Sequence, residues 1–437
     1  MNICHQCVKL WKDRIDLSAI KDDGYELSHH NSVGSINLTL SDSSNNRDPI
    51  QLPVNPECSH YHEKRKFDYI SLGNDKPIKF IKSVYNPAKG PFIFKAAIDY
   101  PHSVFRDTLL FGVGIDFSSN IAVLKAVIEA IERYVYYLPP IIPIFYGTAG
   151  DLAFQNTLSS VLISNDETWW GEAINAKNNQ KLLIPIEMIG ISKYYQRGKN
   201  ITNFRNDTTT GFAIHTTYEN AFLNGFLEYI ERHIMSNLWR NGFLFRVDKS
   251  TLNNHALDLL KLCYKDGYEV EIVFEKYREN FYFFWVFILS TSSNPAKPAL
   301  VSGASCSADP NESLLKAFLE AFKGLKRAEK LWPTSYPSNP SNLYDHFLFY
   351  LEVSNASQIC KEINFPSLKL INFYELEYSF KEDSLLKDFP EEVIYVPLSN
   401  TFLEELGLCA VQVIIPELET INWDQDNSFY KMPLPFS

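Results

Sequence analysis

Hydrophobic positions follow a helical period in three stretches of the chain, at residues 120–137, 217–240 and 310–331. In each stretch, apolar residues recur three or four positions apart, which is typical of a helix with one buried face. A segment rich in small or turn-forming residues precedes each stretch. Asp309-Pro310 also indicates a helix start, because proline is tolerated in the first turn. We therefore predict three long helices.

Runs of aromatic and β-branched residues alternate with these helices and predict strands. The most apolar run, FYFFWVFIL at 281–289, is too short to span a bilayer and predicts a core strand. The other candidate strands are 92–98, 182–189 and 269–274. This alternation indicates one α+β core built from repeated strand–helix units, rather than tandem independent domains.

The two ends of the chain have a different character. Residues 1–75 look irregular and contain DSSNNRD at 42–48, which is typical of a loop or linker. Beyond residue 331, the proline-rich WPTSYPSNPSN interrupts the helical pattern. We divide the chain into a variable N-terminal region (1–75) that could dock a partner, a core (76–330) and a C-terminal part (331–437).

The first two helices share the phrase Ala-x-Leu-x-x-x-x-Glu-x-Ile-Glu-Arg. The copies AVLKAVIEAIER and AFLNGFLEYIER begin 99 residues apart (221 − 122), and SLLKAFLEAFKG at 313–324 keeps the leucine and the first glutamate. Within each full copy, the two glutamates and the arginine share roughly one helix face. The repeated carboxylates are Glu129, Glu132, Glu228, Glu231 and Glu320.

A glutamate–arginine pair on one helix is usually a solvated ion pair that contributes roughly a few tenths of a kcal/mol. Repetition in an apolar register favours another interpretation, because charges on largely buried helices need partners. Carboxylates that converge are held together by cations, so we predict a shared site for Mg²⁺ and a polyphosphate. The chain has neither a G-x-x-x-x-G-K-[ST] loop nor a G-x-S-x-G motif, so any phosphate chemistry would be electrostatic.

Composition excludes some alternatives. A formal net charge of −11 argues against a nucleic-acid-binding surface. We see no signal peptide and no membrane-spanning segment, and seven scattered cysteines fit a reducing cytoplasm. Cys4, Cys7 and Cys58 could bind Zn²⁺, but buried or unreactive thiols are the simpler interpretation.

Three segments resemble, in order and spacing, the ATP-site segments of YcaO-domain proteins. They are GVGIDFSSNIAVLKAVIEAIERY (112–134), TTGFAIHTTYENAFLNGFLEYIER (209–232) and SGASCSADPNESLLKAFLE (302–320). The resemblance covers about residues 76–437, and the C-terminus is similar to the Pro-x-Pro tail of azoline-forming members. It implies a YcaO-type α+β fold with ATP bound between converging helices.

The resemblance also implies a function. Azoline-forming members are ATP- and Mg²⁺-dependent cyclodehydratases that convert Cys, Ser or Thr of a ribosomally made precursor peptide to thiazoline or oxazoline, for example in bacteriocin and other antibiotic pathways. The implied partners are that peptide, a leader-binding subunit similar to ubiquitin-activating enzymes, a flavin dehydrogenase that could act later, and a second copy of the chain. Two alternatives stay open: thioamide or amidine formation, and a non-catalytic scaffold linked to ribosomal-protein modification.

By the same resemblance, the five repeated glutamates would hold Mg²⁺ against the phosphates of ATP. Arg133 and Arg232 would contact phosphate or orient those carboxylates, and the remaining ATP-site residues would be Lys76, Ser83 and Lys316. The tail, with Pro433, Pro435 and Ser437, would reach into the catalytic site. The chain departs from the family pattern at Lys125, Asn220, His233 and Lys316, where Ser, Glu, Asp and Arg are common, and it ends on Ser437 rather than proline.

Overall fold

The computed structural model describes most of the core and the backbone of a small N-terminal sheet. The described residues are 25–28, 35–41, 47–53, 78–87, 89–99, 109–137, 144–152, 167–189, 209–291, 297–331, 336–337, 343–376, 386, 389, 391–398 and 401–418. For the first three of these segments only the backbone is described.

The N-terminal region contains an antiparallel sheet, although the sequence led us to expect irregular structure there. Its strands are β1 (Tyr25–Ser28), β2 (Ser35–Ser41) and β3 (Arg47–Pro53), in the order β1-β2-β3. The expectation was wrong because β2, SINLTLS, alternates polar and apolar residues, which is a strand signal that the surrounding serines and asparagines obscure. Of the loop predicted at 42–48, residues 42–46 lie outside the described residues, and Arg47 and Asp48 belong to β3.

A second three-stranded antiparallel sheet starts the core. It consists of β4 (Ile78–Tyr85), β5 (Phe92–Asp99) and β6 (Leu109–Asp116), with β6 at one edge. Helix α3 (Ser119–Tyr137) follows β6 and packs against it very closely. A Cβ added to Gly112 would lie 2.1 Å from the carbonyl oxygen of Ala126, so only glycine allows this approach.

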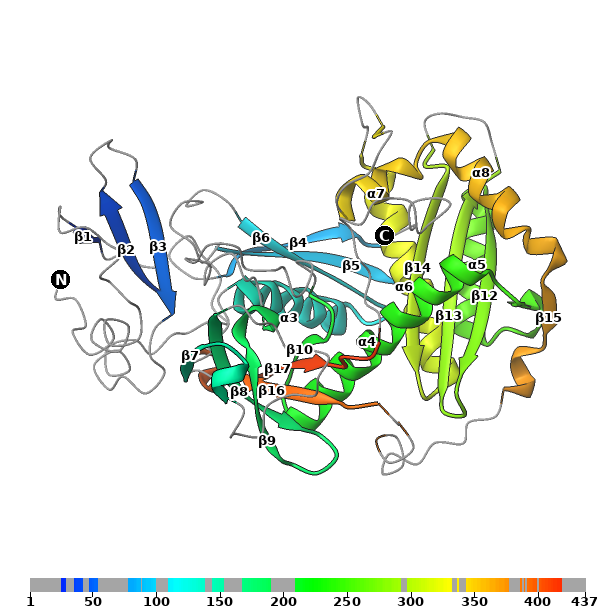
Figure 1. The fold of residues 1–437 in the computed structure, drawn as a ribbon. Coiled ribbons are helices and arrows are strands. Elements are labelled where there is room, and N and C mark those ends of the chain that lie inside the picture. The colour runs from blue at the N-terminus through cyan, green and yellow to red at the C-terminus, as the bar shows by residue number, and fades with distance from the viewer. Residues whose placement is uncertain are drawn as a thin grey trace.

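The central sheet of the core has six strands and includes both early and late parts of the chain (Figure 1). Its order is β10 (Phe212–His215), β17 (Cys409–Ile414), β16 (Ile394–Leu398), β8 (Thr168–Asn175) and β7 (Phe145–Gly147), and β9 (Lys181–Pro185) pairs with β8. Between β16 and β17 lies the short helix α9 (Thr401–Glu405). The strand predicted at 182–189 is shorter than expected, because the chain turns into a 3₁₀ helix at Ile186–Met188.

The third core sheet has five strands in the order β14 (Leu300–Ser307), β13 (Phe281–Ser290), β12 (Tyr268–Tyr277), β11 (Phe245–Val247) and β15 (Lys369–Ile371). Only the β11–β15 pair is parallel among the described pairs. The associated helices are α4 (Tyr218–Asn241), α5 (Asn254–Lys265), α6 (Pro310–Ala328), α7 (Leu343–Phe349) and α8 (Val353–Ile363).

Strand β13 explains the apolar run noted in the sequence. Phe283 and Trp285 belong to the core cluster that includes α4, whereas Phe284 and Val286 belong to the cluster that includes α5 and α6. Because both faces of the strand are covered, polar residues do not alternate with apolar ones. The prediction of a core strand is confirmed.

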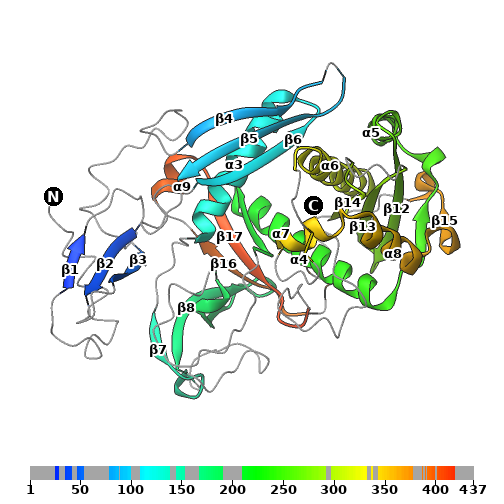
Figure 2. The same cartoon turned by 90° about the horizontal axis from the view of Figure 1, so that it is seen from above.

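Three strand–helix units recur in the core: β6 leads into α3, β10 into α4 and β14 into α6. Figure 2 shows α3 beside β6 and α6 beside β14. Helix α4 packs against β10 and β17 of the central sheet and against β14 of the third sheet, so it joins the two. The predicted α+β fold with repeated strand–helix units is confirmed. No helix in the described part of the chain is long and apolar enough to cross a membrane.

Candidate functional site

The three long helices begin in the same way, two residues after a strand ends. The connections are residues 117–118, 216–217 and 308–309. Thr217 caps α4 by accepting a hydrogen bond from the Asn220 amide (3.2 Å), and Asp309 caps α6 by accepting one from the Asn311 amide (2.8 Å). The short connections and caps fix where each helix starts relative to its strand, and therefore where its carboxylates lie.

A glycine precedes the first glutamate of each unit by the same number of residues. The three spacings are 17 residues (129 − 112, 228 − 211 and 320 − 303), which places Gly112, Gly211 and Gly303 at equivalent positions. A Cβ on Gly112 would lie 2.9 Å from the carbonyl carbon of Glu129, and one on Gly303 would lie 2.8 Å from that of Glu320. In the first and third units, glycine thus lets the strand touch the turn that bears the carboxylate, whereas a Cβ on Gly211 would lie 2.4 Å from the Val413 carbonyl oxygen. Sequence reasoning missed these residues, although the repeated spacing is visible in the sequence.

Glu129 lies at the free edge of β6. Its Oε2 accepts a hydrogen bond from the Val113 amide (2.9 Å), which is available because β6 has no second neighbouring strand in the described sheet. Its Oε1 is 2.6 Å from the Arg133 guanidinium, four residues further along α3. The carboxylate is therefore held between a backbone donor and a cation, with 26% of the side chain exposed.

On α4, one arginine serves two carboxylates. The Arg232 guanidinium lies 3.8 Å from Glu228 and 3.7 Å from Glu231. On α6, Glu320 pairs with Lys323 (2.5 Å) and Lys316 pairs with Glu312 (2.8 Å). Three helices thus each contribute a carboxylate that is paired with a basic residue of the same helix.

The carboxylates of the three helices affect one another's pKa values. Burial, and then the charges of Glu228 and Glu129, raise the pKa of Glu132 well above its usual value, although a backbone hydrogen bond from Ile214 opposes this. The effect of Glu228 on Glu132 joins α4 to α3, so these carboxylates are close enough to repel each other.

The same coupling joins α4 to α6. Burial raises the pKa of Glu231 to about 7, with Arg232 opposing and the charges of Glu228 and Glu320 adding to the increase. Lys323 of α6 links that helix to α3. Burial alone would lower the pKa of this lysine, but the charges of Glu320 on α6 and Glu129 on α3 raise it. The repeated carboxylates of α3, α4 and α6 are therefore near enough to one another to interact electrostatically.

This site fits Mg²⁺ together with a polyphosphate better than it fits a metal ion held by protein alone. No group of three or more His, Cys, Asp or Glu side chains in the described residues could hold a metal ion. Mg²⁺ typically binds one or two carboxylates and completes its coordination with water and phosphate oxygens. Burial, and then the charges of neighbouring carboxylates, raise the pKa values of Glu132 and Glu231, and a bound divalent cation would offset both effects.

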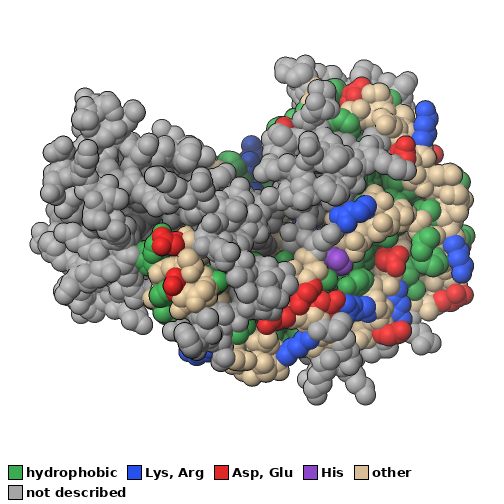
Figure 3. Space-filling view, in the orientation of Figure 1, with side chains coloured by type: hydrophobic (Ala, Val, Ile, Leu, Met, Phe, Trp, Pro, Cys, Tyr) green, Lys and Arg blue, Asp and Glu red, His purple; other side chains and the backbone are tan. Residues whose placement is uncertain are grey.

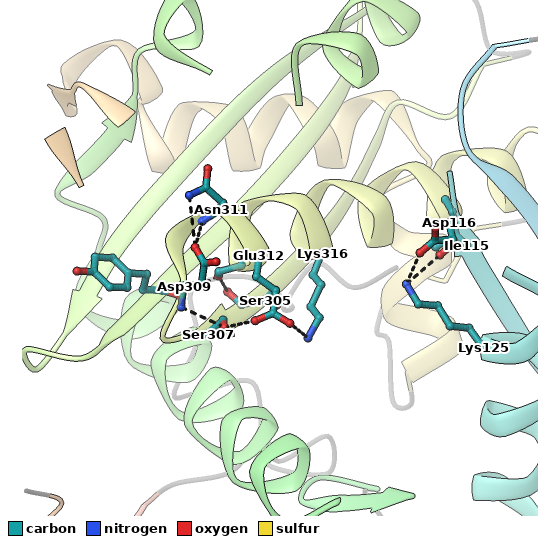
Figure 4. Close-up of polar contacts among 11 residues, drawn as sticks. Ile115, Asp116, Lys125, Ser305, Ser307, Asp309, Asn311, Glu312 and Lys316 are labelled. Atoms are coloured by element: carbon teal, nitrogen blue, oxygen red, sulfur yellow. Dashed lines mark hydrogen bonds and ion pairs between the residues drawn. The ribbon is translucent and has the colours of Figure 1, made fainter. Parts of the chain in front are cut away.

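Lys125 and Glu312 lie at the ends of the strands, where the helices begin (Figure 4). Lys125 contacts Asp116 (2.8 Å) at the end of β6, and Glu312 accepts a hydrogen bond from Ser307 (2.6 Å) at the end of β14. Burial opposes ionisation of Glu312, but Lys316, Ser307 and Lys125 together lower its pKa. Lys125, where the family often has serine, therefore contacts the end of β6.

Several predicted residues lie apart from this site or outside the description. Ser83 is exposed on β4, opposite Phe94 of β5, and no described contact joins it to the carboxylates. Lys76, Pro433, Pro435 and Ser437 lie outside the described residues, as do the zinc candidates Cys4, Cys7 and Cys58. Sequence reasoning also missed Lys323, which pairs with Glu320 and whose pKa the charge of Glu129 also raises.

On the face shown in Figure 3, the basic side chains lie interspersed with acidic ones.

A family model matches much of the chain. The model for YcaO cyclodehydratases, which bind ATP and Mg²⁺, matches residues 113–419, more than half of the 437-residue chain. The match contains all three strand–helix units apart from the first residues of β6. Comparison with curated proteins gives no match.

Solved structures share the fold at low sequence identity. YcaO from Methanopyrus kandleri, bound with AMPPCP and Mg²⁺, aligns with a TM-score of 0.60 at 15% identity, over 82% of this chain and 90% of that one. A heterocyclase in complex with substrate and cofactor gives 0.63 at 13% identity, over 98% of this chain and 66% of that one. A chain of the E. coli microcin synthetase McbBCD complex gives 0.60 at 13% identity, over 77% and 88%.

Proposed function

This chain belongs to the YcaO family, and from that premise we propose that it is an ATP-dependent cyclodehydratase that forms azolines in a ribosomally made peptide. The observation that supports the proposal most strongly is the electrostatic interaction among carboxylates of α3, α4 and α6. A site with excess buried carboxylate charge and adjacent cations suits a metal-bound polyphosphate.

The proposed reaction removes one water from the peptide at the expense of ATP. The side chain of a substrate Cys, Ser or Thr loses its proton and attacks the preceding backbone carbonyl carbon, and the resulting oxyanion takes the terminal phosphoryl group of ATP, which releases ADP. Phosphate then leaves with that oxygen, and loss of the amide proton forms the C=N bond of the ring. Amide oxygen is a poor leaving group, so its conversion to phosphate is the step that the enzyme must assist.

We assign the chain's residues to that chemistry as follows. Glu129, Glu132, Glu228, Glu231 and Glu320 would hold Mg²⁺, which would neutralise phosphate charge. Arg133 and Arg232 orient these carboxylates through the ion pairs described above. Lys316, Ser83 and Lys76 would contact the nucleotide, and the tail with Pro433, Pro435 and Ser437 would approach the reacting groups.

The substrate and partners follow from the same proposal. A heterocyclase of this fold binds a substrate, and the E. coli microcin synthetase is a complex of different subunits. We expect this chain to act in the cytoplasm on a precursor peptide, with a leader-binding subunit similar to ubiquitin-activating enzymes and a second copy of the chain. A flavin dehydrogenase could then oxidise azolines to azoles in a bacteriocin-type product.

The test combines phosphate release with mass spectrometry of the peptide. The full chain, its partner subunit and a candidate precursor peptide are incubated with Mg·ATP, alongside Glu129→Ala and Glu231→Ala. We expect one water lost per modified residue, matched by released phosphate and abolished in both variants. ATP turnover without loss of water would instead indicate thioamide or amidine formation. Absence of Mg·ATP binding would indicate a non-catalytic scaffold.

A further inference from the structure

A row of basic residues leads across the first core sheet to the carboxylate site. Lys82 on β4 is directly opposite Lys95 on β5, and Lys95 is directly opposite Val113 on β6. Directly opposite residues of antiparallel strands project from the same face, so both lysines lie on one face of the sheet. Val113 in turn donates its amide hydrogen to Glu129. The row therefore ends beside the carboxylate site.

Helix α6 packs beside this row and adds a further cation, Arg327. Lys330 of α6 donates a hydrogen bond to the Val84 carbonyl of β4, and the Phe322 ring of α6 lies 5.8 Å from that of Tyr85. Arg327 follows Lys323 by four residues and Glu320 by seven, which puts the three on one face of the helix. Its guanidinium lies 5.0 Å from the ring centre of Phe347, and the Lys95 ammonium lies 3.4 Å from that of Phe111. Aromatic rings attract a cation without neutralising its charge.

Basic side chains outnumber acidic ones among the residues named so far in and beside this row. Arg133 is paired with Glu129, and Lys323 is paired with Glu320. Within the described part of the chain, no ion pair involves the other three basic residues, Lys82, Lys95 and Arg327. Burial, together with the charges of Arg327, Lys82 and Arg133, lowers the pKa of Lys95. Like charges directly opposite one another destabilise a sheet, so this arrangement is unfavourable until an anion joins it.

We propose that Lys82, Lys95 and Arg327 form an anion site that binds a phosphoryl group next to the carboxylates. The inference rests on the proposed function, which supplies two sources of that group: the terminal phosphate of the nucleotide and the inorganic phosphate that the reaction releases. A phosphoryl group suits three cations on β4, β5 and α6 better than a carboxylate does. It presents three charged oxygens in a tetrahedral arrangement, whereas a carboxylate presents two in one plane.

The direct test is calorimetric titration of the full chain with inorganic phosphate in the absence of Mg²⁺. The variants are Lys95→Met and Arg327→Gln. The matched control is Lys181→Met, an exposed lysine on β9 that pairs with Glu172. We expect each variant to bind phosphate about tenfold more weakly than wild type, with the control unchanged. Unchanged phosphate binding in both variants would overturn the proposal.

A second titration with Mg·ATP and Mg·ADP distinguishes the two sources. If the site takes the terminal phosphate of the nucleotide, the variants lose affinity for Mg·ATP but keep their affinity for Mg·ADP. If it takes released phosphate, both nucleotides bind as in wild type and only inhibition by added phosphate weakens. Either pattern supports the anion site, whereas equal weakening for ATP, ADP and the control contradicts it.

Thermal unfolding without phosphate excludes a merely structural role. Lys95→Met removes a like-charge contact, so we expect a Tm equal to or above that of wild type; a Tm below that of Lys181→Met would contradict the proposal. Phosphate binding needs no peptide. If peptide modification fails while phosphate binding depends on Lys95, the proposed function is wrong and the anion site stands.

Discussion

Replacing Glu231 with glutamine should stabilise the free protein while weakening its binding of Mg²⁺-nucleotide. Burial and neighbouring carboxylates raise the pKa of Glu231 from 4.5 to about 7, and only 14% of its side chain is exposed. Because the folded pKa is above the unfolded one, the native protein binds more protons between these values. The stability of the free protein therefore falls as pH rises from about 4.5 to about 7.

The size of the effect follows from the shift. A difference of 2.5 units (7 − 4.5) corresponds to about 3 kcal/mol of unfolding free energy, lost in full above pH 7. Glutamine has no charge to bury, so Glu231→Gln should exceed wild type by about 3 kcal/mol at pH 8 but by only about 1 kcal/mol at pH 5. Binding of Mg²⁺ requires the ionised carboxylate, so wild-type affinity should rise about tenfold between pH 6 and pH 8.

Urea unfolding at pH 5 and pH 8, without Mg²⁺ or nucleotide, measures the first effect. The control is Glu172→Gln, an exposed glutamate on β8 that also pairs with a lysine. Calorimetric titration with Mg²⁺ and a non-hydrolysable ATP analogue measures the second. If Glu231→Gln is less stable than wild type at pH 8, or if its advantage does not depend on pH, the assignment of Glu231 as a strained buried carboxylate is refuted.

Three further substitutions test the framework that positions the site. Gly303→Ala would place a methyl group 2.2 Å from the Ala321 amide nitrogen, so α6 must move. The free energy of unfolding, measured in urea, should fall by about 2–4 kcal/mol. In the control Gly150→Ala, the Cβ would be 3.5 Å from Thr148 Oγ1, so this change should be nearly neutral. Thr217→Ala removes the α4 cap and should cost about 1 kcal/mol in the same assay, whereas Thr217→Ser should preserve most of it. Lys323→Met should weaken nucleotide binding, because it removes the cation that pairs with Glu320 and also interacts with the charge of Glu129, and added Mg²⁺ should recover part of the affinity. Equal stability of both glycine variants, no effect at Thr217, or unchanged nucleotide affinity at Lys323 would contradict the respective arguments.

The periodic parts of the fold could be predicted from the sequence. The three helices begin within one residue of their predicted starts, because each combines a long apolar period with a capping or turn-forming residue. The third ends at Ala328 rather than residue 331, where the chain turns at Glu329. The repeated glutamates could be recognised for the same reason, because a motif that recurs in similar helices places its residues at equivalent helix positions.

Features that depend on strand register could not be predicted in this way. The pairing of Lys82 with Lys95 depends on a register with irregularities on both sides, between Ile78 and Phe80 and between Ser83 and Tyr85. Nor does any local pattern link two strands to Arg327 on α6. The N-terminal sheet was missed because a single alternating segment predicts a strand but not its partners.

The central claim is that α3, α4 and α6 contribute carboxylates to one Mg²⁺-nucleotide site. It is tested most directly by calorimetric titration with Mg²⁺ and a non-hydrolysable ATP analogue of one variant from each helix: Glu129→Gln, Glu228→Gln and Glu320→Gln. The account predicts that each of the three weakens binding by about tenfold or more while Glu172→Gln does not, and that double variants lose less than the sum of the single losses. Wild-type affinity in any one of the three would remove that helix from the site and contradict the account.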